Sequence, residues 1–326
     1  MKALTTTFSL LAARLPAVVD RRVVAAAWVS LVVQIGIVGT GGAVRLTGSG
    51  LGCPTWPRCT PESFVNTPEM GIHGVIEFGN RLLTFVLVVV AVVTFVLVLR
   101  LRRERPDLFR LALLLGLGIP AQAVLGGVTV LTGLDPWIVG AHFVVSIVLV
   151  VLATMLVHRV RFGRPSAEFA VPPLFVVIAK IAAVAVGVTV LVGVVTTGSG
   201  PHAGDAATPR NGLDPSVLQH VHSWPAYLTL GLTVTLLAMV VTAGLRQVRG
   251  PVILLLAVEV AQMAVGISQS RLGLPEILVG LHMVLACILV AAMTTVVLAM
   301  RGRTSVDPRS AGSGEALREA QRPAMA

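Results

Sequence analysis

The sequence predicts an all-α integral membrane protein, with eight transmembrane helices arranged as two four-helix bundles related by a pseudo-two-fold axis. Three observations lead to this prediction: long apolar segments, basic residues that alternate between the loops, and an internal repeat. Of the 326 residues, 55% are hydrophobic and 12% are charged, whereas charged residues make up about a quarter of an ordinary soluble domain. The composition therefore excludes a soluble enzyme, a nucleic-acid-binding domain and a disordered chain.

Eight segments reach the length of about 20 predominantly apolar residues that a membrane span needs. They lack the apolar/polar alternation of membrane barrel strands, so helices are expected. The first segment follows Arg21-Arg22 and has no small-residue cleavage site, which predicts an anchor and not a removed signal peptide. The expected spans are residues 24–43, 72–99, 110–132, 137–157, 174–196, 218–244, 251–271 and 276–300.

The basic residues alternate strictly from loop to loop. Nineteen of the 25 lie before the first span, in every second loop or after the last span, and only four lie in the other loops. Basic loops stay in the cytoplasm, so the N-terminal segment 1–23 and the tail 301–326 are predicted to be cytoplasmic, with the chain in the cell (plasma) membrane. The tail has the composition of a disordered segment. Orientation toward anionic lipid explains the net charge of +10, and no nucleic-acid partner is expected.

An internal repeat divides the chain into the halves 24–160 and 174–300. The segment Thr-Gly-Ser-Gly at 47–50 recurs at 197–200. Three further residues recur at an offset of 140, with Gln122, Gly126 and His142 matching Gln262, Gly266 and His282. Each half holds four spans, and an even number returns the chain to the same side. The halves are therefore predicted to be parallel repeats about an axis along the membrane normal, an arrangement also found in transporters.

Histidines near the outer ends of spans are the main candidate ligands. His142 and His282 occupy the matching contexts Val-Gly-Ala-His-Phe-Val and Val-Gly-Leu-His-Met-Val, and His222 lies near the start of the sixth span. Two imidazoles on opposing helices supply an axial pair for a haem iron, while two imidazoles alone make a thin shell for zinc or copper. His220 lies about 200° around the helix from His222, so both cannot face one site. We choose His222 because it is the repeat equivalent of Asn80.

The two halves are chemically unequal. The second half offers two imidazoles, whereas the first offers His142, Asn80 and an acid, Glu77, one helical turn before Asn80 on the same face. An iron with one strong ligand beside a buried carboxylate suits chemistry on a bound molecule, with Glu77 as proton donor or acceptor. Two alternatives stay open: Glu77 pairs with Arg81 at i,i+4, or His73 ligates the first-half metal.

Small and sulfur-containing residues add further predictions. Cys53 and Cys59 lie in a Gly/Pro-rich outer loop, where an oxidising compartment allows a disulfide; a redox pair and a metal site are the alternatives. Cys287 is expected to pack in the core. The glycines at 126–127 and Gly266 would let helices or a flat cofactor approach closely.

Three segments of the chain resemble the haem A synthase family. They read Gly-Gly-Ala-Val-Arg-Leu-Thr-Gly-Ser-Gly-Leu-Gly-Cys-Pro-Thr-Trp-Pro-Arg-Cys at 41–59, Ile-Glu-Phe-Gly-Asn-Arg at 76–81 and Gln-Ala-x-x-Gly-Gly at 122–127. The resemblance extends over roughly 24–300, and the second half matches more loosely but in the same order.

The resemblance implies an oxidoreductase that acts on a CH group of haem O. The family converts the C8 methyl to a formyl group by successive hydroxylations, giving haem A for terminal oxidases. Haem O is then the substrate, haem O synthase is the expected supplier, and an unidentified acceptor takes the electrons. The rival function is a bis-His b-type membrane cytochrome that transfers electrons between quinone and a partner.

The family's pattern also implies roles for individual residues. A haem b cofactor would lie in the second half on His222 and His282, and the substrate haem would lie in the first half on His142. The family's essential acid falls on Glu77. Its paired cysteines fall on Cys53 and Cys59, which implies a disulfide.

One position departs from the family's pattern. The second span often carries Glu-x-x-His, and this chain has Asn80 in the place of that histidine. Ligation of the substrate iron from the second span therefore falls to His73 or to no residue.

Overall fold

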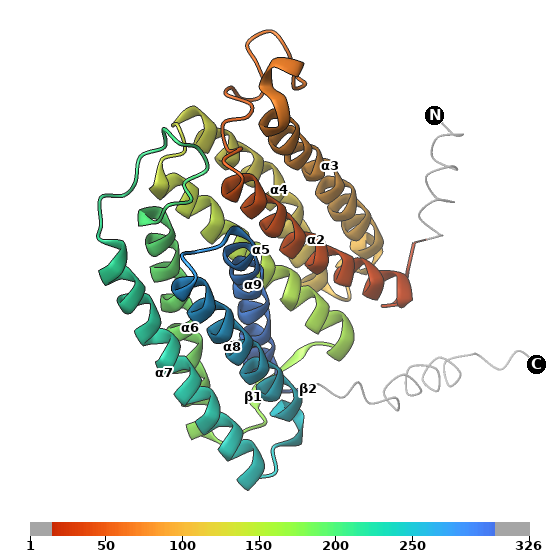
Figure 1. The fold of residues 1–326 in the computed structure, drawn as a ribbon. Coiled ribbons are helices and arrows are strands. Elements are labelled where there is room, and N and C mark those ends of the chain that lie inside the picture. The colour runs from red at the N-terminus through yellow and green to blue at the C-terminus, as the bar shows by residue number, and fades with distance from the viewer. Residues whose placement is uncertain (1–14, 304–326) are drawn as a thin grey trace, which may run out of the picture.

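A computed structural model describes residues 15–303 of the chain and contains eight helices that are long and apolar enough to cross a membrane (Figure 1). The predicted all-α fold with eight transmembrane helices is confirmed. The helices are α2 (Arg21–Leu46), α3 (Gly71–Leu99), α4 (Pro106–Leu131), α5 (Pro136–Phe162), α6 (Pro173–Ser199), α7 (Pro215–Thr242), α8 (Arg246–Arg271) and α9 (Glu276–Ala299). The short elements are η1 (Pro68–Met70), η2 (Arg100–Arg102), β1 (Pro165–Phe169) and β2 (Arg301–Arg303).

Proline and aspartate define several helix starts. Helices α4, α5, α6 and α7 begin with proline, whose missing N–H is not needed in the first turn. Helix α2 begins at Arg21, earlier than the predicted residue 24, because the Asp20 carboxylate accepts hydrogen bonds from the backbone N–H groups of Arg22 and Val23 at 2.9 and 3.1 Å. The last residues of the predicted N-terminal segment therefore belong to the helix, while residues 1–14 lie outside the described part of the chain.

The helices pack as two groups of four. In the first group α2 contacts α3 and α5, and α4 contacts α3 and α5. In the second group α7 contacts α6 and α8, and α9 contacts α6 and α8. The groups meet where α9 packs on α5 and α2 and where α5 packs on α6 (Figure 1). The pseudo-two-fold relation between the groups stays a prediction.

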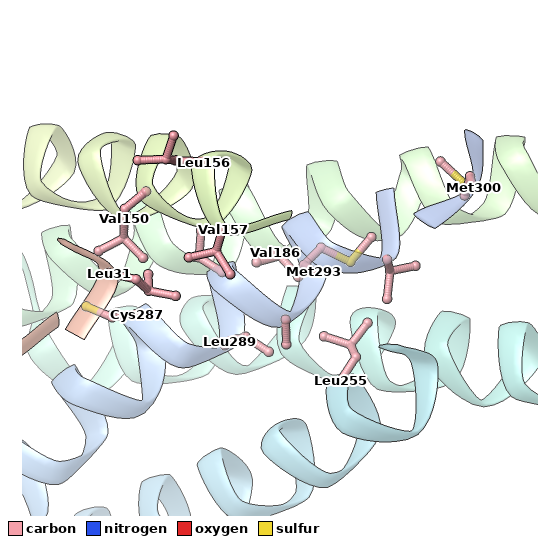
Figure 2. Packing of buried hydrophobic residues seen from close by; sticks show 14 of the residues in the cluster. Leu31, Val150, Leu156, Val157, Val186, Leu255, Cys287, Leu289, Met293 and Met300 are labelled. Atoms are coloured by element: carbon pink, nitrogen blue, oxygen red, sulfur yellow. The ribbon is translucent and has the colours of Figure 1, made fainter. Parts of the chain in front are cut away.

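The hydrophobic core lies along the junction of the two groups. Leu31 and Val150 from the first group belong to the same buried cluster as Val186 and Met293 from the second (Figure 2). Cys287 is a free, fully buried cysteine in this cluster, as its predicted role in core packing requires. Because this core joins the groups, it fixes them side by side.

A small antiparallel sheet was not predicted. Strand β1 pairs with β2, with Pro165 opposite Arg303 and Phe169 opposite Arg301. The Arg301 guanidinium also lies 4.9 Å from the centre of the Phe169 ring, within the range of a cation–π contact. The tail that was predicted to be disordered from residue 301 thus begins with an ordered strand, and residues 304–326 lie outside the described part.

The loops gather at two ends of the bundle. One end, called the arginine-rich end, carries the segments 100–105, 163–172, 243–245 and 301–303. There Asp107 lies between three arginine side chains, at 3.0 Å from Arg105 and 3.7 Å from Arg159 and Arg164.

The opposite end, called the disulfide end, carries the segments 47–70, 132–135, 200–214 and 272–275. The two groups are linked there by Arg45 on α2, whose guanidinium donates to the carbonyl oxygens of His202 at 2.6 Å and Thr197 at 2.9 Å. The Gly50 N–H also donates to the Gly204 carbonyl at 2.8 Å. The first-half loop is therefore bonded directly to the second half.

Candidate functional site

The structure brings His222 of α7 and His282 of α9 together in the second half. Their ring centroids lie 6.2 Å apart, with an angle of 73° between the ring planes. The Nδ1 atom of each ring is buried and has no hydrogen-bond partner among the described residues. Buried polar atoms are normally hydrogen-bonded, so this pair is suited to a ligand that supplies the missing contacts.

Glycines make room for both rings. A Cβ atom at Gly193 would lie 2.8 Å from Cε1 of His222, and one at Gly266 would lie 3.1 Å from Cε1 of His282. Contacts this short would displace the rings, so a residue with a side chain at either position would disturb the pair. The Gln262 side chain also donates to the His282 carbonyl at 3.1 Å, which fixes α9 against α8 beside the ring.

The geometry of the pair fits two axial ligands of a haem. With a metal–nitrogen bond of about 2 Å, the centres of two opposed rings would lie roughly 6 Å apart. A ring can turn about its metal–nitrogen bond, so the angle between the planes is compatible with this arrangement. Within residues 15–303, no group of three or more His, Cys, Asp or Glu side chains could hold a metal ion. Zinc or copper would therefore have only the two imidazoles, whereas a porphyrin supplies the other ligands itself.

His142 on α5 has the same setting as His282. A Cβ atom at Gly126 would lie 3.2 Å from its Cε1 atom, and Gln122 donates to its carbonyl at 3.1 Å. Its Nδ1 atom is also buried and finds no partner in the described part of the chain. The matching Gln, Gly and His of the two halves thus form matching contacts.

Asn80 on α3 is the residue that the sequence repeat matches to His222. Its Oδ1 atom is buried without a hydrogen-bond partner in residues 15–303, and its Nδ2 atom lies 4.0 Å from a Cβ atom built at Gly41 of α2. By the repeat, this amide is expected to take the part in the first half that the second imidazole, His222, has in the second.

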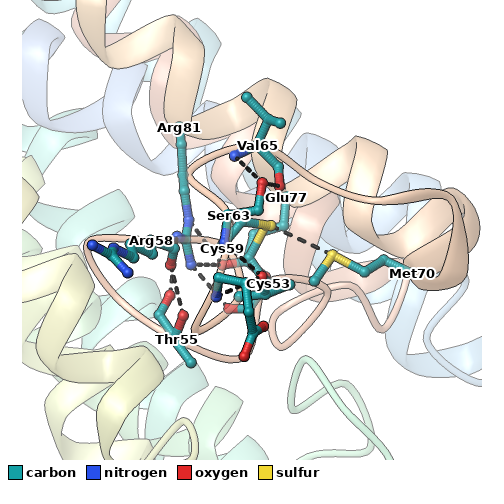
Figure 3. Close-up of a disulfide and its surroundings, with 11 residues drawn as sticks. Cys53, Thr55, Arg58, Cys59, Ser63, Val65, Met70, Glu77 and Arg81 are labelled. Carbon is teal, nitrogen blue, oxygen red and sulfur yellow. Dashed lines mark hydrogen bonds and ion pairs between the residues drawn. A yellow bond between two sulfur atoms is a disulfide. The ribbon is translucent and has the colours of Figure 1, made fainter.

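Glu77 on α3 is buried, with 5% of its surface exposed, and both of its oxygens are occupied (Figure 3). Oε2 accepts a hydrogen bond from the Cys53 backbone N–H at 2.6 Å. Oε1 lies 2.5 Å from Nη2 of Arg81, so the i,i+4 ion pair considered from the sequence is present. Three N–H donors therefore surround the carboxyl group: the Cys53 backbone N–H and the Nε and Nη2 groups of Arg81.

Arg81 also holds the disulfide loop, which we define as residues 53–59 (Figure 3). Cys53 and Cys59 form a disulfide and are fully buried. The Arg81 guanidinium donates to the carbonyl oxygens of Cys53 at 3.0 Å, Thr55 at 3.1 Å and Arg58 at 3.2 Å. A cross-link and one arginine therefore fix the loop above α3.

Trp56, inside the disulfide loop, packs on α4 at a position that the sequence did not reveal. Gly127 is buried, and a Cβ atom there would overlap the Trp56 indole. The signal was present as a tryptophan between two cysteines and as paired glycines in the third span. The prediction of a close approach at these glycines holds, but the approaching groups are a histidine and a tryptophan.

The remaining histidine candidates lie at exposed positions. His73 is at the start of α3, and its Nδ1 atom lies 2.9 Å from Oγ of Ser49. The ring of His220 is bonded to the Ser216 carbonyl of its own helix at 2.8 Å. The structure thus pairs His222, and not His220, with His282.

Comparison with known proteins places this geometry in context. The model of a family described as cytochrome oxidase assembly protein matches residues 25–294. A protein of Geobacillus thermodenitrificans is 32% identical over 135 residues, which are 41% of this chain and 42% of that protein. A protein of Geobacillus kaustophilus (strain HTA426) is 30% identical over 129 residues, which are 39% of this chain and 40% of that protein. Both are named Heme A synthase, and the matches span about two fifths of the length of each.

Proposed function

We propose that this chain, which belongs to the cytochrome oxidase assembly protein family, acts as a haem A synthase and oxidises the C8 methyl of haem O to a formyl group. The observation that carries the proposal is the inequality of two matching settings. His142 and His282 are held by the same contacts. His282 lies beside His222, whereas the first half has Asn80 at the position that the repeat matches to His222. The names of the two relatives support this function.

The second half, residues 174–300, is the proposed cofactor half. His222 and His282 would hold the iron of haem b, and the bound haem would supply a centre that takes up and passes on single electrons. The close contacts of Gly193 and Gly266 would keep the two rings in place.

The first half, residues 24–160, is the proposed substrate half. His142 would bind the iron of haem O on one side. The Asn80 amide is a weaker ligand than an imidazole, so the other side would stay without a strong bond from α3. We prefer no second ligand to His73, because the ring of His73 is exposed and bonded to Ser49. A singly liganded substrate could bind and leave.

Glu77 is the proposed catalytic residue. Each hydroxylation adds an oxygen atom from water and releases two electrons and two protons. Glu77 is a buried carboxyl group in this half, and its role would be that of a base that accepts a proton from water at the C8 substituent. The electrons would leave toward an acceptor outside this chain.

The arginine-rich end is proposed to face the cytoplasm. The excess of basic residues at this end favours that orientation in the cell membrane, and the disulfide is compatible with an oxidising outer compartment. Haem O would be supplied by a haem O synthase in the same bilayer.

Conversion of haem O tests the proposal directly. The chain is expressed in a host that makes haem O but lacks haem A, and the extracted pigments are separated. We expect haem A from the unchanged chain and unconverted haem O from the His142→Ala variant. A membrane-inserted chain that contains haem b but leaves haem O unconverted would instead indicate the electron-transfer cytochrome.

A further inference from the structure

We infer that Trp56 forms a wall of the substrate porphyrin site beside His142, and that Arg81 and the disulfide position this wall. The inference rests on the proposed function, because it assigns an aromatic contact to the haem O site. It makes Trp56 a positioning residue for substrate binding.

Two rings from other parts of the chain pack against consecutive glycines of α4. Gly126 faces the His142 imidazole, with its Cβ position 3.2 Å from Cε1. Gly127 faces the Trp56 indole, which occupies the space that a side chain would need. Consecutive residues project about 100° apart around a helix, so the two rings contact neighbouring sides of α4. A porphyrin bound to His142 would meet the indole where it extends past α4. Indole offers a flat apolar surface to a flat apolar ligand.

The second step is the fixation of the indole. The chain on both sides of Trp56 is held, because Arg81 donates to the carbonyl oxygens of Thr55 and Arg58 (Figure 3). The disulfide closes the same segment six residues apart. A rigid aromatic wall orders a ligand without losing its own freedom on binding.

The third step is the contrast with the cofactor half. At the offset of 140, the equivalent of Gly127 is Ile267, and the loop 197–217 contains no cysteine. The Ile267 side chain is 41% exposed, so the equivalent position carries a branched side chain in place of a glycine. The aromatic wall is thus found in the first half, which would bind the substrate. The second half, which would bind the cofactor, lacks it at this position.

The test compares haem O binding by variants of the full chain in detergent. Trp56→Leu keeps an apolar side chain but removes the flat ring, and Trp56→Phe restores an aromatic ring. Trp137→Leu is the matched control, because Trp137 lies at the disulfide end and is 56% exposed. The apparent Kd comes from absorbance titration with haem O, and turnover gives KM and kcat separately.

We expect Trp56→Leu to raise the Kd and KM for haem O about tenfold, with a smaller change in kcat and unchanged haem b content. Trp56→Phe should recover most of the affinity, and Trp137→Leu should match the unchanged chain. Equal Kd values for Trp56→Leu and the unchanged chain would overturn the inference. If Trp56→Leu loses haem b through misfolding, Trp56→Met replaces it as the variant without a ring, and a Kd above that of Trp56→Phe supports the wall while an equal Kd overturns it.

The binding measurement separates this inference from the proposed function. If the unchanged chain binds haem O through Trp56 but never converts it, the wall stands and the proposed activity fails. If the unchanged chain makes haem A and Trp56→Leu does so with the same KM, only the wall is lost.

Discussion

The two halves of the molecule hold His142 and His282 in the same way and differ at the position that the repeat matches to His222. In both halves a glutamine side chain bonds the histidine carbonyl at 3.1 Å, and a glycine lies against the imidazole. The difference is Asn80 on α3 against His222 on α7. The repeated setting therefore keeps the support of one histidine, while the residue that the repeat matches to His222 differs between the halves.

The loops at the disulfide end differ as well. The first half has a cross-linked loop bonded to Glu77 and Arg81, whereas the second-half loop has no cysteine and is bonded to Arg45 from the first half. The first-half loop is therefore fixed by contacts within its own half, whereas the second-half loop depends on a residue of the other half. Variants that equalise or remove these differences test the comparison.

Removal of either second-half imidazole should have the largest effect. We expect His222→Ala and His282→Ala to lose nearly all haem b, because one ligand remains and the pair is the proposed attachment. The measurement is the haem b absorbance per mole of purified protein. His220→Ala is the control, since the ring of His220 is exposed and bonded to its own helix. Full haem content in both ligand variants would refute the assignment.

Removal of the ion pair between Arg81 and Glu77 should lower the stability of the folded protein. We expect Arg81→Gln to cost about 3 kcal/mol, because it leaves the buried Glu77 carboxylate without its ion pair. Thermal unfolding in detergent and protease cleavage of residues 53–59 measure the effect. Arg58→Gln is the control, because the Arg58 side chain is exposed and lies over Phe64. Addition of Glu77→Gln to Arg81→Gln should recover part of the lost unfolding free energy. If the effects of the two substitutions simply add, the ion pair does not stabilise the protein.

Replacement of Asn80 by histidine, the residue at the matching position of the second half, should change how haem O is bound. We expect Asn80→His to bind haem O about tenfold more tightly and to give the spectrum of an iron with two imidazoles, since the added ring is equivalent to His222. Absorbance and electron paramagnetic resonance of the loaded protein measure this change. Asn80→Ala removes the amide without adding a ligand and should leave the spectrum unchanged. An unaltered spectrum in Asn80→His would show that α3 does not face the substrate iron.

The smallest effect concerns the start of α7. The Ser216 hydroxyl and the backbone N–H groups of Ser216 and Val217 bond to Asp214 and hold its pKa below the usual 3.8. A lowered pKa stabilises the folded state above the unfolded pKa, and this contribution is lost as the pH falls through the folded pKa. Asp214→Asn keeps a capping oxygen but removes the titrating group. The stability of the variant, measured by unfolding at different pH values, should therefore fall slightly less at acid pH. An identical acid profile in both proteins would contradict this.

The sequence predicted the helices well because length and hydropathy are local properties. Their ends were less accurate, since they depend on caps and on proline. The seventh span was expected to begin at 251, but α8 begins at Arg246 and contains Pro251. The sheet between 165–169 and 301–303 joins segments too far apart in the chain for local patterns to reveal.

The candidate site was predictable where the chain repeats itself. The repeat singled out His282 and, through Asn80, His222, and the structure places these two rings 6.2 Å apart. Trp56 was not predicted, because its position depends on how a loop without regular structure folds back on α4. Residue types left the partner of Glu77 open, and the structure shows Arg81.

Arg45 has a consequence for any electron that travels between the halves. Its bonds to the carbonyl oxygens of His202 and Thr197 join the halves at the end where both histidine settings lie. A rocking movement of one half against the other would break these bonds and the shared hydrophobic contacts of Leu31 and Met293. These contacts oppose such a movement, so under the proposed function the distance between the two histidine settings would stay the same from one turnover to the next.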